Sequence, residues 1–496
     1  MTVGRTPVLV LVGALTVAAA LGQGWQGERK VNEGEPFYSI TPQLAVDSSG
    51  YPWLLWHGYQ PGFSLMYAKW LGDRWDKVRT VTPDTQPGLR GGYAPSLCFD
   101  RQGRAWAAWS DVYEDNKGDV STSRWADSCW SPPVRVNDDT SNNNEAGNIG
   151  SGGGETWCVW EAWRGYGING WPFALNVSRW DSVSQRWMPV ARLAPPDTSE
   201  YYWWNDMAVD ARGRPHVVWC AVPLYCVLYS FYDGDSWSTP VPVNDTATVT
   251  ASWMAAPRIV VDRTGAMHLC FTGAVAGAQH RDVFYCRNDG AGWSQPVRVT
   301  QDTVTNYDEW YSAVTADRPD NVWVTFDRQN EGPDQFRVYA SHHDGHEWSP
   351  EVRLDGDSLY HDDGPAVCVG LDGLPWVAWD GKSDASGTWE VYYNRYVSVG
   401  VRDSSQLVAA TPRLIERMTN HPSADLEIVL MLATAAHVRV QVLDLVGRQQ
   451  AIVYDGLAAP GRRVVHWRCA VPSGVYFCRA TADGRTEIRK LVVTGH

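Results

Sequence analysis

The stretch Leu44-Ala-Val-Asp47-Ser-Ser-Gly50-Tyr-Pro-Trp53-Leu-Leu-Trp56 decides the fold, because the chain repeats its pattern. A short apolar run ends in a D-x-x-G turn, and a strand that carries two tryptophans follows it. Seven copies of one unit indicate a repeat architecture in which each unit packs against its neighbours. The other copies are Leu97–Trp109, a degenerate copy at Gly152–Trp160, and copies around Asp210, Asp262, Asp317 and Asp372.

A second element recurs with the same period. It is a tight turn followed by tryptophan and a short strand, as in Trp130-Ser-Pro-Pro-Val-Arg-Val-Asn137, and a tyrosine-rich segment such as Leu65–Trp70 separates the two elements. Each unit therefore predicts four short strands, and four antiparallel strands repeated at this period are typical of a β-propeller. These tryptophans are Trp75, Trp130, Trp187, Trp237, Trp293 and Trp348, at spacings of 50 to 57 residues.

The two ends of the repeat region complement each other. The seventh unit runs through Trp389–Tyr393 without a tryptophan strand of its own, whereas Trp25–Asn32 matches Trp237–Asn244 and precedes Trp75 by 50 residues. We predict an all-β fold: a seven-bladed β-propeller closed by an N-terminal strand, plus a small C-terminal β-sandwich.

The sequence divides into four predicted segments. Residues 1–22 indicate a signal peptide, with Arg5 before an apolar stretch of about 14 residues, shorter than the roughly 20 that a spanning helix needs. An uncleaved anchor is the alternative. The propeller is predicted over residues 23–400, a linker over 401–411 and the β-sandwich over 412–496.

The charge balance excludes some partners. The 496 residues include 42 Lys and Arg against 56 Asp and Glu, a net charge of −14, and no basic stripe occurs. Nucleic acid and anionic membrane surfaces are therefore not expected partners, and no later segment is long and apolar enough to span a membrane.

No cofactor is predicted. Asp138-Asp139 with Asn142–Glu145 is rich in oxygen ligands and would be the weak candidate for calcium, without the D-x-D-x-D-G spacing.

Two of the turns before an outer tryptophan carry a resemblance to a known family. Ser230–Trp237 and Ser341–Trp348 resemble the Asp-box of bacterial neuraminidase repeats, S-x-D-x-G-x-x-W, with the Asp one place late. The resemblance implies a sialidase-like propeller. Members that are hydrolases use an arginine triad for the substrate carboxylate, a Tyr nucleophile assisted by Glu, and an Asp acid/base. Their Arg-Ile-Pro element is absent here, and Pro257-Arg258-Ile259 is the nearest match.

The tail resembles another known element, the type A sorting domain of the type IX secretion system. The resemblance implies passage through the outer membrane and release or anchoring at the cell surface, with that secretion machinery as a partner. A plain accessory sandwich is the alternative. The matching residues are Asn420-His-Pro422, Val440–Arg448, Gly461, Trp467, Ser473–Phe477 and Arg489-Lys490.

The long connections indicate where a ligand would bind. In a propeller the tight turns share one face, so the long, variable connections lie on the other face, around the axial channel. Aromatic faces beside carboxylates and arginines suit a sugar. The ligand-binding candidates are Trp163, Arg164, Trp203, Trp204, Trp253, Arg281, Trp310, Tyr311 and Arg328. The weaker catalytic candidates are Asp206, Asp308, Glu309, Asp362 and Asp363. The alternative for each is a solvated loop charge or a packing aromatic.

These features predict a secreted or cell-surface propeller that binds glycans or another extracellular polymer through its loop face. Two alternatives stay open, an exo-glycosidase of sialidase type and a non-catalytic scaffold that binds proteins. An enzyme would need two carboxylates facing each other at roughly 5 to 9.5 Å.

Overall fold

The protein is described by a computed structural model, and the described residues form strands and no helix. The all-β expectation is confirmed. The chain divides into two compact units, residues 1–399 and residues 400–496. Among the described residues, no helix has the length and apolar character to cross a membrane. The described residues are 23–31, 38–59, 63–81, 89–113, 118–126, 128–138, 143–164, 171–194, 201–252, 255–278, 280–301, 308–329, 335–356, 360–383, 387–398, 415–420, 425–432, 436–444, 448–458, 461–468, 471–472, 474–482 and 485–493. The predicted signal peptide and linker lie outside them.

Seven antiparallel sheets make up the described part of the first unit, and we number them in chain order. Sheet 1 contains β3 (Tyr38–Val46), β4 (Pro52–Tyr59), β5 (Phe63–Lys69) and β6 (Arg79–Thr80). Sheet 2 contains β7 (Leu89–Phe99), β8 (Ala105–Tyr113), β9 (Gly118–Ala126), β10 (Cys129–Trp130) and β11 (Val134–Arg135). Sheet 3 contains β12 (Asn143–Gly152), β13 (Glu155–Arg164), β14 (Trp171–Asp181), β15 (Arg186–Trp187) and β16 (Ala191–Ala194). Sheet 4 contains β17 (Tyr201–Val209), β18 (Pro215–Val222), β19 (Cys226–Phe231) and β20 (Val241–Pro242).

The remaining sheets of this unit follow the same order. Sheet 5 contains β21 (Val249–Ala251), β22 (Arg258–Val261), β23 (Met267–Val275), β24 (Asp282–Asn288) and β25 (Val297–Arg298). Sheet 6 contains β26 (Asp308–Arg318), β27 (Asn321–Gln329), β28 (Phe336–His343) and β29 (Val352–Arg353). Sheet 7 contains β30 (His361–Val369), β31 (Pro375–Lys382) and β32 (Glu390–Ser398), together with β1 (Gln23–Trp25) and β2 (Arg29–Lys30) from the start of the chain.

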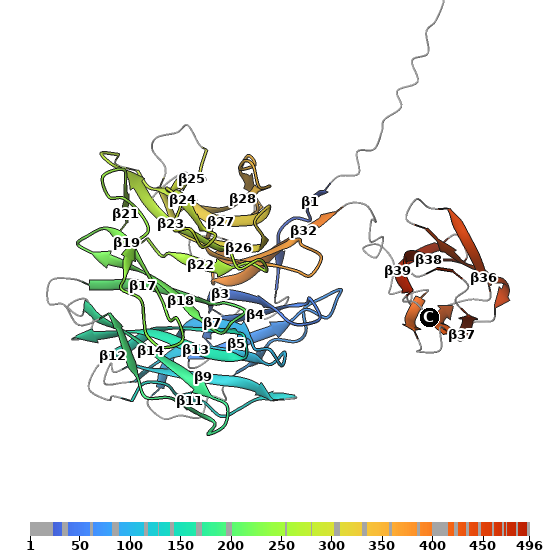
Figure 1. The fold of residues 1–496 in the computed structure, drawn as a ribbon, viewed down its shortest axis with the longest axis horizontal. Coiled ribbons are helices and arrows are strands. Elements are labelled where there is room, and N and C mark those ends of the chain that lie inside the picture. The colour runs from blue at the N-terminus through green and yellow to red at the C-terminus, as the bar shows by residue number, and fades with distance from the viewer. Residues whose placement is uncertain are drawn as a thin grey trace, which may run out of the picture. The chain divides into compact units, whose positions relative to one another are not determined.

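The sheets follow one another around a common centre. The first strand of each sheet contacts the first strand of the next, through β3, β7, β12, β17, β22, β26 and β30, and β30 contacts β3 in turn. Figure 1 shows the colours passing in chain order around this unit, with β1 beside β32. Trp25 pairs with Tyr396, and Arg29 pairs with Tyr393. The architecture is propeller-like, and its last sheet joins both ends of the repeat region.

The outer tryptophans link neighbouring sheets. Each lies near the turn into the outermost strand and packs edge-on against an aromatic ring in the second or third strand of the preceding sheet. Trp25 of sheet 7 packs in the same way on Trp323 of sheet 6, as its place in the repeat predicts. The pairs are Trp75–Trp376, Trp130–Trp53, Trp187–Trp106, Trp237–Trp157, Trp293–Tyr229, Trp348–Tyr285 and Trp25–Trp323, with ring centroids 5.1 to 6.4 Å apart.

The D-x-x-G turns form as the repeat predicts. In the first of them, Asp47 Oδ1 accepts the N–H groups of Ser49 and Tyr51 at 2.8 and 3.0 Å. Gly50 takes a φ of 83°, a conformation that glycine adopts without the steric cost of a side chain. Asp100, Asp210 and Asp262 accept hydrogen bonds from the residues two and four places later in the same way.

The second unit contains two antiparallel sheets among its described residues. One has the order β33–β34–β37 and the other the order β36–β35–β38–β39. Buried side chains of both sheets, such as Ile428, Val440 and Cys478, form one apolar cluster. The strands are β33 (Ile415–Asn420), β34 (Asp425–Leu432), β35 (Ala436–Leu443), β36 (Gln449–Ala458), β37 (Gly461–Arg468), β38 (Gly474–Ala482) and β39 (Arg485–Val493).

Candidate functional site

The first strands carry an irregularity at one common position. The pairing of the first and second strands shifts register at Ile40/Gln43, Tyr93/Ser96, Glu145/Asn148, Trp203/Asp206, Glu309/Ser312 and Asp363/Ala366. In sheet 5 the pairing is interrupted between β21 and β22 at the corresponding place. A bulge turns side chains out of their regular alternation. These bulges lie in the first strands, which contact one another around the centre of the unit.

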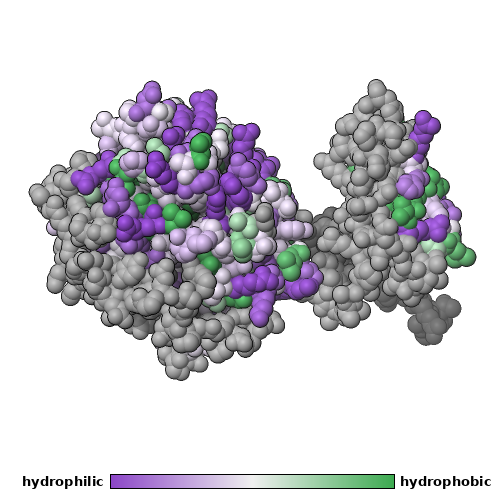
Figure 2. All heavy atoms as spheres, turned by 90° about the horizontal axis from the view of Figure 1, so that it is seen from below, coloured by the Kyte–Doolittle hydropathy of each residue, from purple (hydrophilic) through white to green (hydrophobic). Residues whose placement is uncertain are grey.

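A cavity of about 370 Å³ lies at these bulges. Its volume is at the lower end of the ~300–1,000 Å³ typical of small-ligand sites. All seven sheets contribute to its wall, so it lies on the common axis. The lining residues are Ile40, Thr41, Gln43, Ala94, Pro95, Asn148, Trp204, Asn205, Ala256, Arg258, Tyr311, Ser312, Asp363, Gly364, Pro365, Asp380 and Trp389. Figure 2 shows one face of the molecule, where hydrophilic residues cover much of the coloured surface and hydrophobic ones form small separate patches.

Two of the seven sheets place a large aromatic residue at the bulge. Trp204 and Tyr311 line the cavity with ring centroids 6.0 Å apart, whereas four other sheets place a small residue where sheet 4 has Trp204. Trp204 has a φ of 54°, a conformation that few residues other than glycine adopt and that concentrates at functional sites. Half-buried Trp389 adds a third ring. The small counterparts are Thr41, Ala94, Ala256 and Gly364.

A ring of buried polar residues surrounds the bulges. In each second strand the residue after the second aromatic of the repeat is polar and buried, and several of these residues bond to the next sheet. Thr272 Oγ1 donates to the carbonyl of Trp310 at 3.0 Å, and Asp380 Oδ1 accepts from the N–H of Thr41 at 2.9 Å. Such bonds fasten several of the bulges to a neighbouring sheet. Its members are His57, Ser110, Glu161, Cys220, Thr272, Asp327 and Asp380.

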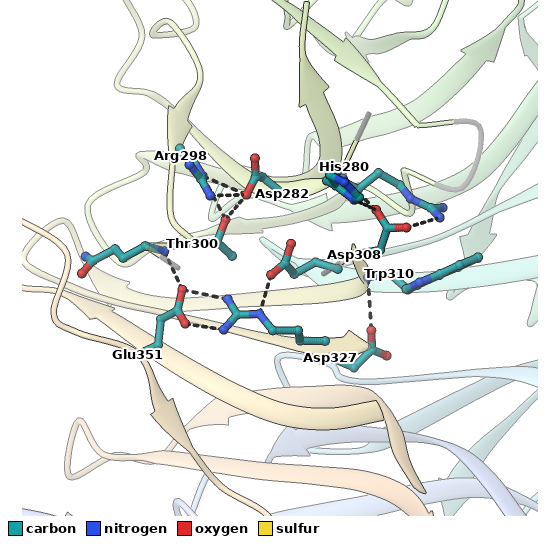
Figure 3. A network of polar contacts seen from close by, with 12 residues as sticks. His280, Asp282, Arg298, Thr300, Asp308, Trp310, Asp327 and Glu351 are labelled. Atoms are coloured by element: carbon teal, nitrogen blue, oxygen red, sulfur yellow. Dashed lines mark hydrogen bonds and ion pairs between the residues drawn. The ribbon is translucent and has the colours of Figure 1, made fainter. Parts of the chain in front are cut away.

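Asp327 is a heavily bonded member of the ring. One of its oxygens accepts the N–H group of Trp310 at 3.2 Å (Figure 3) and that of Tyr311 at 3.0 Å. The other oxygen accepts the N–H group of Gly364 at 3.0 Å. Burial and the nearby Asp363 carboxyl raise the pKa of Asp327, and the three N–H donors act in the opposite direction. Because its oxygens are committed to backbone groups, Asp327 holds the cavity wall in place.

Asp363 and Asp380 form the carboxyl pair of the cavity. Asp380 is buried and hydrogen bonds to the side chain of Asp363, whose other neighbour is His361, with Nε2 2.9 Å from Asp363 Oδ2. Burial and Asp363 raise the pKa of Asp380 well above its usual range. The Asp363 side chain remains 28% exposed and can meet a ligand.

Arg258 is the arginine that lines the cavity, and it faces an acidic neighbour. Asp206 lies close enough for the Arg258 charge to lower the pKa of its carboxyl, against a larger upward shift from burial. One oxygen of Asp206 accepts the N–H of Ile259 at 2.8 Å and so joins sheets 4 and 5. Burial, together with the carboxyls of Asp327, Asp363 and Asp380, raises the pKa of Tyr311, so its hydroxyl stays protonated.

The other predicted charged residues lie outside the cavity lining and contact one another. Arg281 Nη2 lies 3.3 Å from Asp308 Oδ2, and its guanidinium stacks 3.9 Å from the Trp310 ring. Arg328 is buried between Glu309 at 2.6 Å and Glu351 at 2.8 Å (Figure 3). The carboxyls of Asp308, Glu309 and Glu351 therefore already compensate two of the predicted substrate-binding arginines.

The remaining predicted residues are distributed as follows. Asp362 is buried behind the wall, where one oxygen accepts Trp379 Nε1 at 2.8 Å and burial raises the pKa of Asp362 to about 9. Trp163 and Trp203 pack on each other with centroids 5.0 Å apart. Trp253, the Arg164 side chain and much of the calcium candidate 138–145 lie outside the described residues. Within the described part, no cluster of three or more His, Cys, Asp or Glu side chains is arranged for a metal.

Sequence reasoning found Trp204, Tyr311 and Asp363 but missed Asp380, Arg258 and Asn148 as parts of the site. Two signals were available. A polar residue follows W-x-x-[WF] in the second strand of five of the seven units. A small residue precedes proline at Thr41-Pro42, Ala94-Pro95, Ala256-Pro257 and Gly364-Pro365. Together these patterns mark the bulge and the ring around it.

Comparisons with known proteins give structural likenesses alone. No protein-family model matches the chain, and no curated protein matches it. Among solved structures, it is similar to a protein of unknown function from Dyadobacter fermentans DSM 18053, at 12% identity over 76% of this chain and 99% of that one, with a TM-score of 0.48. It is also similar to a PL25 ulvan lyase, at 10% identity over 75% and 95%, with a TM-score of 0.48. A third is the NanB sialidase from Streptococcus pneumoniae, at 11% identity over 75% and 70%, with a TM-score of 0.40. Likenesses at this level assign no activity to the chain.

Proposed function

We propose that the first unit is a seven-bladed β-propeller, closed by β1 and β2, that binds a glycan or another extracellular polymer in its axial cavity. The observation that carries the proposal is the cavity itself. Three aromatic rings and a partly exposed carboxylate converge there, from sheets 4, 6 and 7. Sugar rings stack their C–H faces on aromatic rings while their hydroxyls bond to charged groups, so this combination suits a sugar unit.

The carboxyl geometry favours binding over two-carboxylate hydrolysis. Most glycosidases other than sialidases hold their two carboxyls roughly 5 to 9.5 Å apart, so that a sugar carbon or a water fits between them. Asp363 and Asp380 are in hydrogen-bond contact, which leaves no such space. Tyr311, whose pKa is raised, is poorly suited to act as an ionised nucleophile. We therefore put binding before the exo-glycosidase alternative.

The second part of the proposal concerns location. The predicted signal peptide and the resemblance of residues 412–496 to a type IX sorting domain support export to the cell surface or beyond. In that setting the accessible ligands are polysaccharides and glycoproteins, which agrees with a sugar-binding cavity. A protein-binding scaffold remains the alternative if no sugar binds.

The experiment is a binding screen on a glycan array, followed by calorimetric titration of the best ligand. Trp204→Ala should weaken its binding at least tenfold, which corresponds to about 1.4 kcal/mol. The fold should tolerate this change, because Ala94 and Ala256 take the same place and a positive φ in sheets 2 and 5. Tyr51→Ala, at an exposed aromatic outside the cavity lining, is the control and should bind normally. Binding unaffected by Trp204→Ala, or no binding to any glycan, would contradict the proposal.

A further inference from the structure

The charges of the axial cavity define which sugars it can accept. Resting on the proposed function, we infer that the cavity selects a non-acidic sugar, with hydroxyl or ammonium donors, and rejects sugars that carry a carboxylate. The inference departs from the arginine triad that the resemblance to sialidases implies. It rests on the ion-pair partners of the arginines, on the acidic side chains of the cavity, and on which hydrogen-bond donors are already used.

The first step concerns the arginines. A sugar carboxylate is usually held by guanidinium groups in a bidentate fashion. Arg328 is buried between two glutamates, and Arg281 is held by Asp308 and the Trp310 ring. Neither residue lines the cavity. Arg258 does line it, but two acidic side chains, Asp363 and Asp380, line the same cavity.

The second step concerns the acidic groups. Asp363 and Asp380 both line the cavity, and the Asp363 side chain is 28% exposed. A ligand carboxylate placed there would meet a like charge in a partly enclosed site, where Coulomb repulsion is stronger than in water. Lys382 is not a lining residue of the cavity. Its Nζ lies over the Trp389 ring, 4.9 Å from the ring centroid.

The third step concerns hydrogen-bond donors. Asn148 Nδ2 donates to Asn205 at 2.7 and 3.0 Å, and Asn205 Nδ2 donates to Glu161 at 3.3 Å. The Asn148 and Asn205 amides are therefore engaged within the wall, while Asp363 offers acceptor oxygens. At Asp363 the favoured ligand group is a donor, such as a sugar hydroxyl or an ammonium group.

The test uses pairs of sugars that differ in one group, titrated calorimetrically against the full chain. Glucose is compared with glucuronate, galactose with galacturonate, and N-acetylglucosamine with glucosamine, in low salt. The neutral member of each acid pair should bind at least tenfold more tightly than the acid, and glucosamine should bind no more weakly than N-acetylglucosamine. Asp363→Asn should narrow the gap between neutral and acidic sugars, because it removes the negative charge and keeps the shape.

The control is Asp308→Asn, which changes a carboxyl outside the cavity lining and should leave the selectivity unchanged. Uronates that bind as tightly as the neutral sugars, or selectivity that survives Asp363→Asn in full, would overturn the inference and leave the proposed function standing. Absence of binding by every sugar, with no glycan bound on the array, would overturn the proposed function itself. The two failures are therefore distinguishable.

Discussion

A chain that lacks residues 23–31 should unfold at a midpoint lower by on the order of 10 °C than the intact chain. The deletion removes both N-terminal strands of sheet 7 and their pairing with β32. It also removes the contact of Trp25 with Trp323 and the buried side chain of Val31. Loss of a fully buried tryptophan costs about 3–5 kcal/mol. Trp25 is half-buried, but its loss adds to that of Val31 and of the two strand pairings. The sum is a large share of the ~5–15 kcal/mol that stabilises a typical protein.

The measurement is calorimetric or fluorescence-detected thermal unfolding of the two chains. The matched control lacks residues 2–22 and keeps both strands, and its midpoint should equal that of the intact chain if that segment is a cleaved leader. Trp25→Ala should lower the midpoint by an intermediate amount. Equal midpoints for the intact chain and the chain without residues 23–31 would show that the N-terminal strands do not close the ring.

Stability should fall markedly as the pH rises from about 5 to about 8.5, because several buried carboxyls hold raised pKa values. Burial raises the pKa of Glu161 to about 8 and that of Asp362 to about 9, whereas unfolded carboxyls titrate near ~4. Between these values the folded chain binds more protons than the unfolded one. The free energy of unfolding is therefore greatest at low pH and is lost as the pH rises through the folded pKa values. Each such group changes the free energy of unfolding by at most about 1.4 kcal/mol per pH unit. The expected total loss of stability is therefore on the order of several kcal/mol.

Urea unfolding at the two pH values measures this loss. Asp362→Asn keeps the acceptor of the Trp379 Nε1 hydrogen bond and removes one titrating group. It should raise the stability at the higher pH, change little at the lower one, and flatten the dependence. Asp308→Asn, at a partly exposed carboxyl paired with Arg281, should leave the slope unchanged. Stability that rises over this interval, or an equal loss from Asp362→Asn at both pH values, would contradict the assignment.

The repeat in the sequence predicted much of the fold, because every unit must form a tight turn and must pack an aromatic ring against the neighbouring sheet. The D-x-x-G turns, the outer tryptophans and the match of Trp25–Asn32 to the later units each correspond to a contact in the structure. These signals are local, or they repeat at a fixed interval, so one sequence suffices to read them. The abundance of tryptophan is in large part the result of this packing between sheets.

The candidate site was predictable only in part, because it depends on pairings that the sequence does not display. Trp204, Tyr311 and Asp363 were identified as polar or aromatic residues near connections, and they do line the cavity. Nothing local distinguishes Arg328, which is bound to Glu351 23 residues away, from an arginine free to bind a ligand. Asp380 looks like an ordinary strand residue until the bulges of seven sheets are brought to one axis.

The most direct test of the central claim is the crystal structure of the protein with its best glycan ligand. The claim predicts one sugar ring in the axial cavity, stacked on Trp204 or Tyr311, with a hydroxyl or ammonium donor bonded to Asp363. A ligand bound to the outer strands or to the second unit, with the axial cavity holding only water, would contradict it.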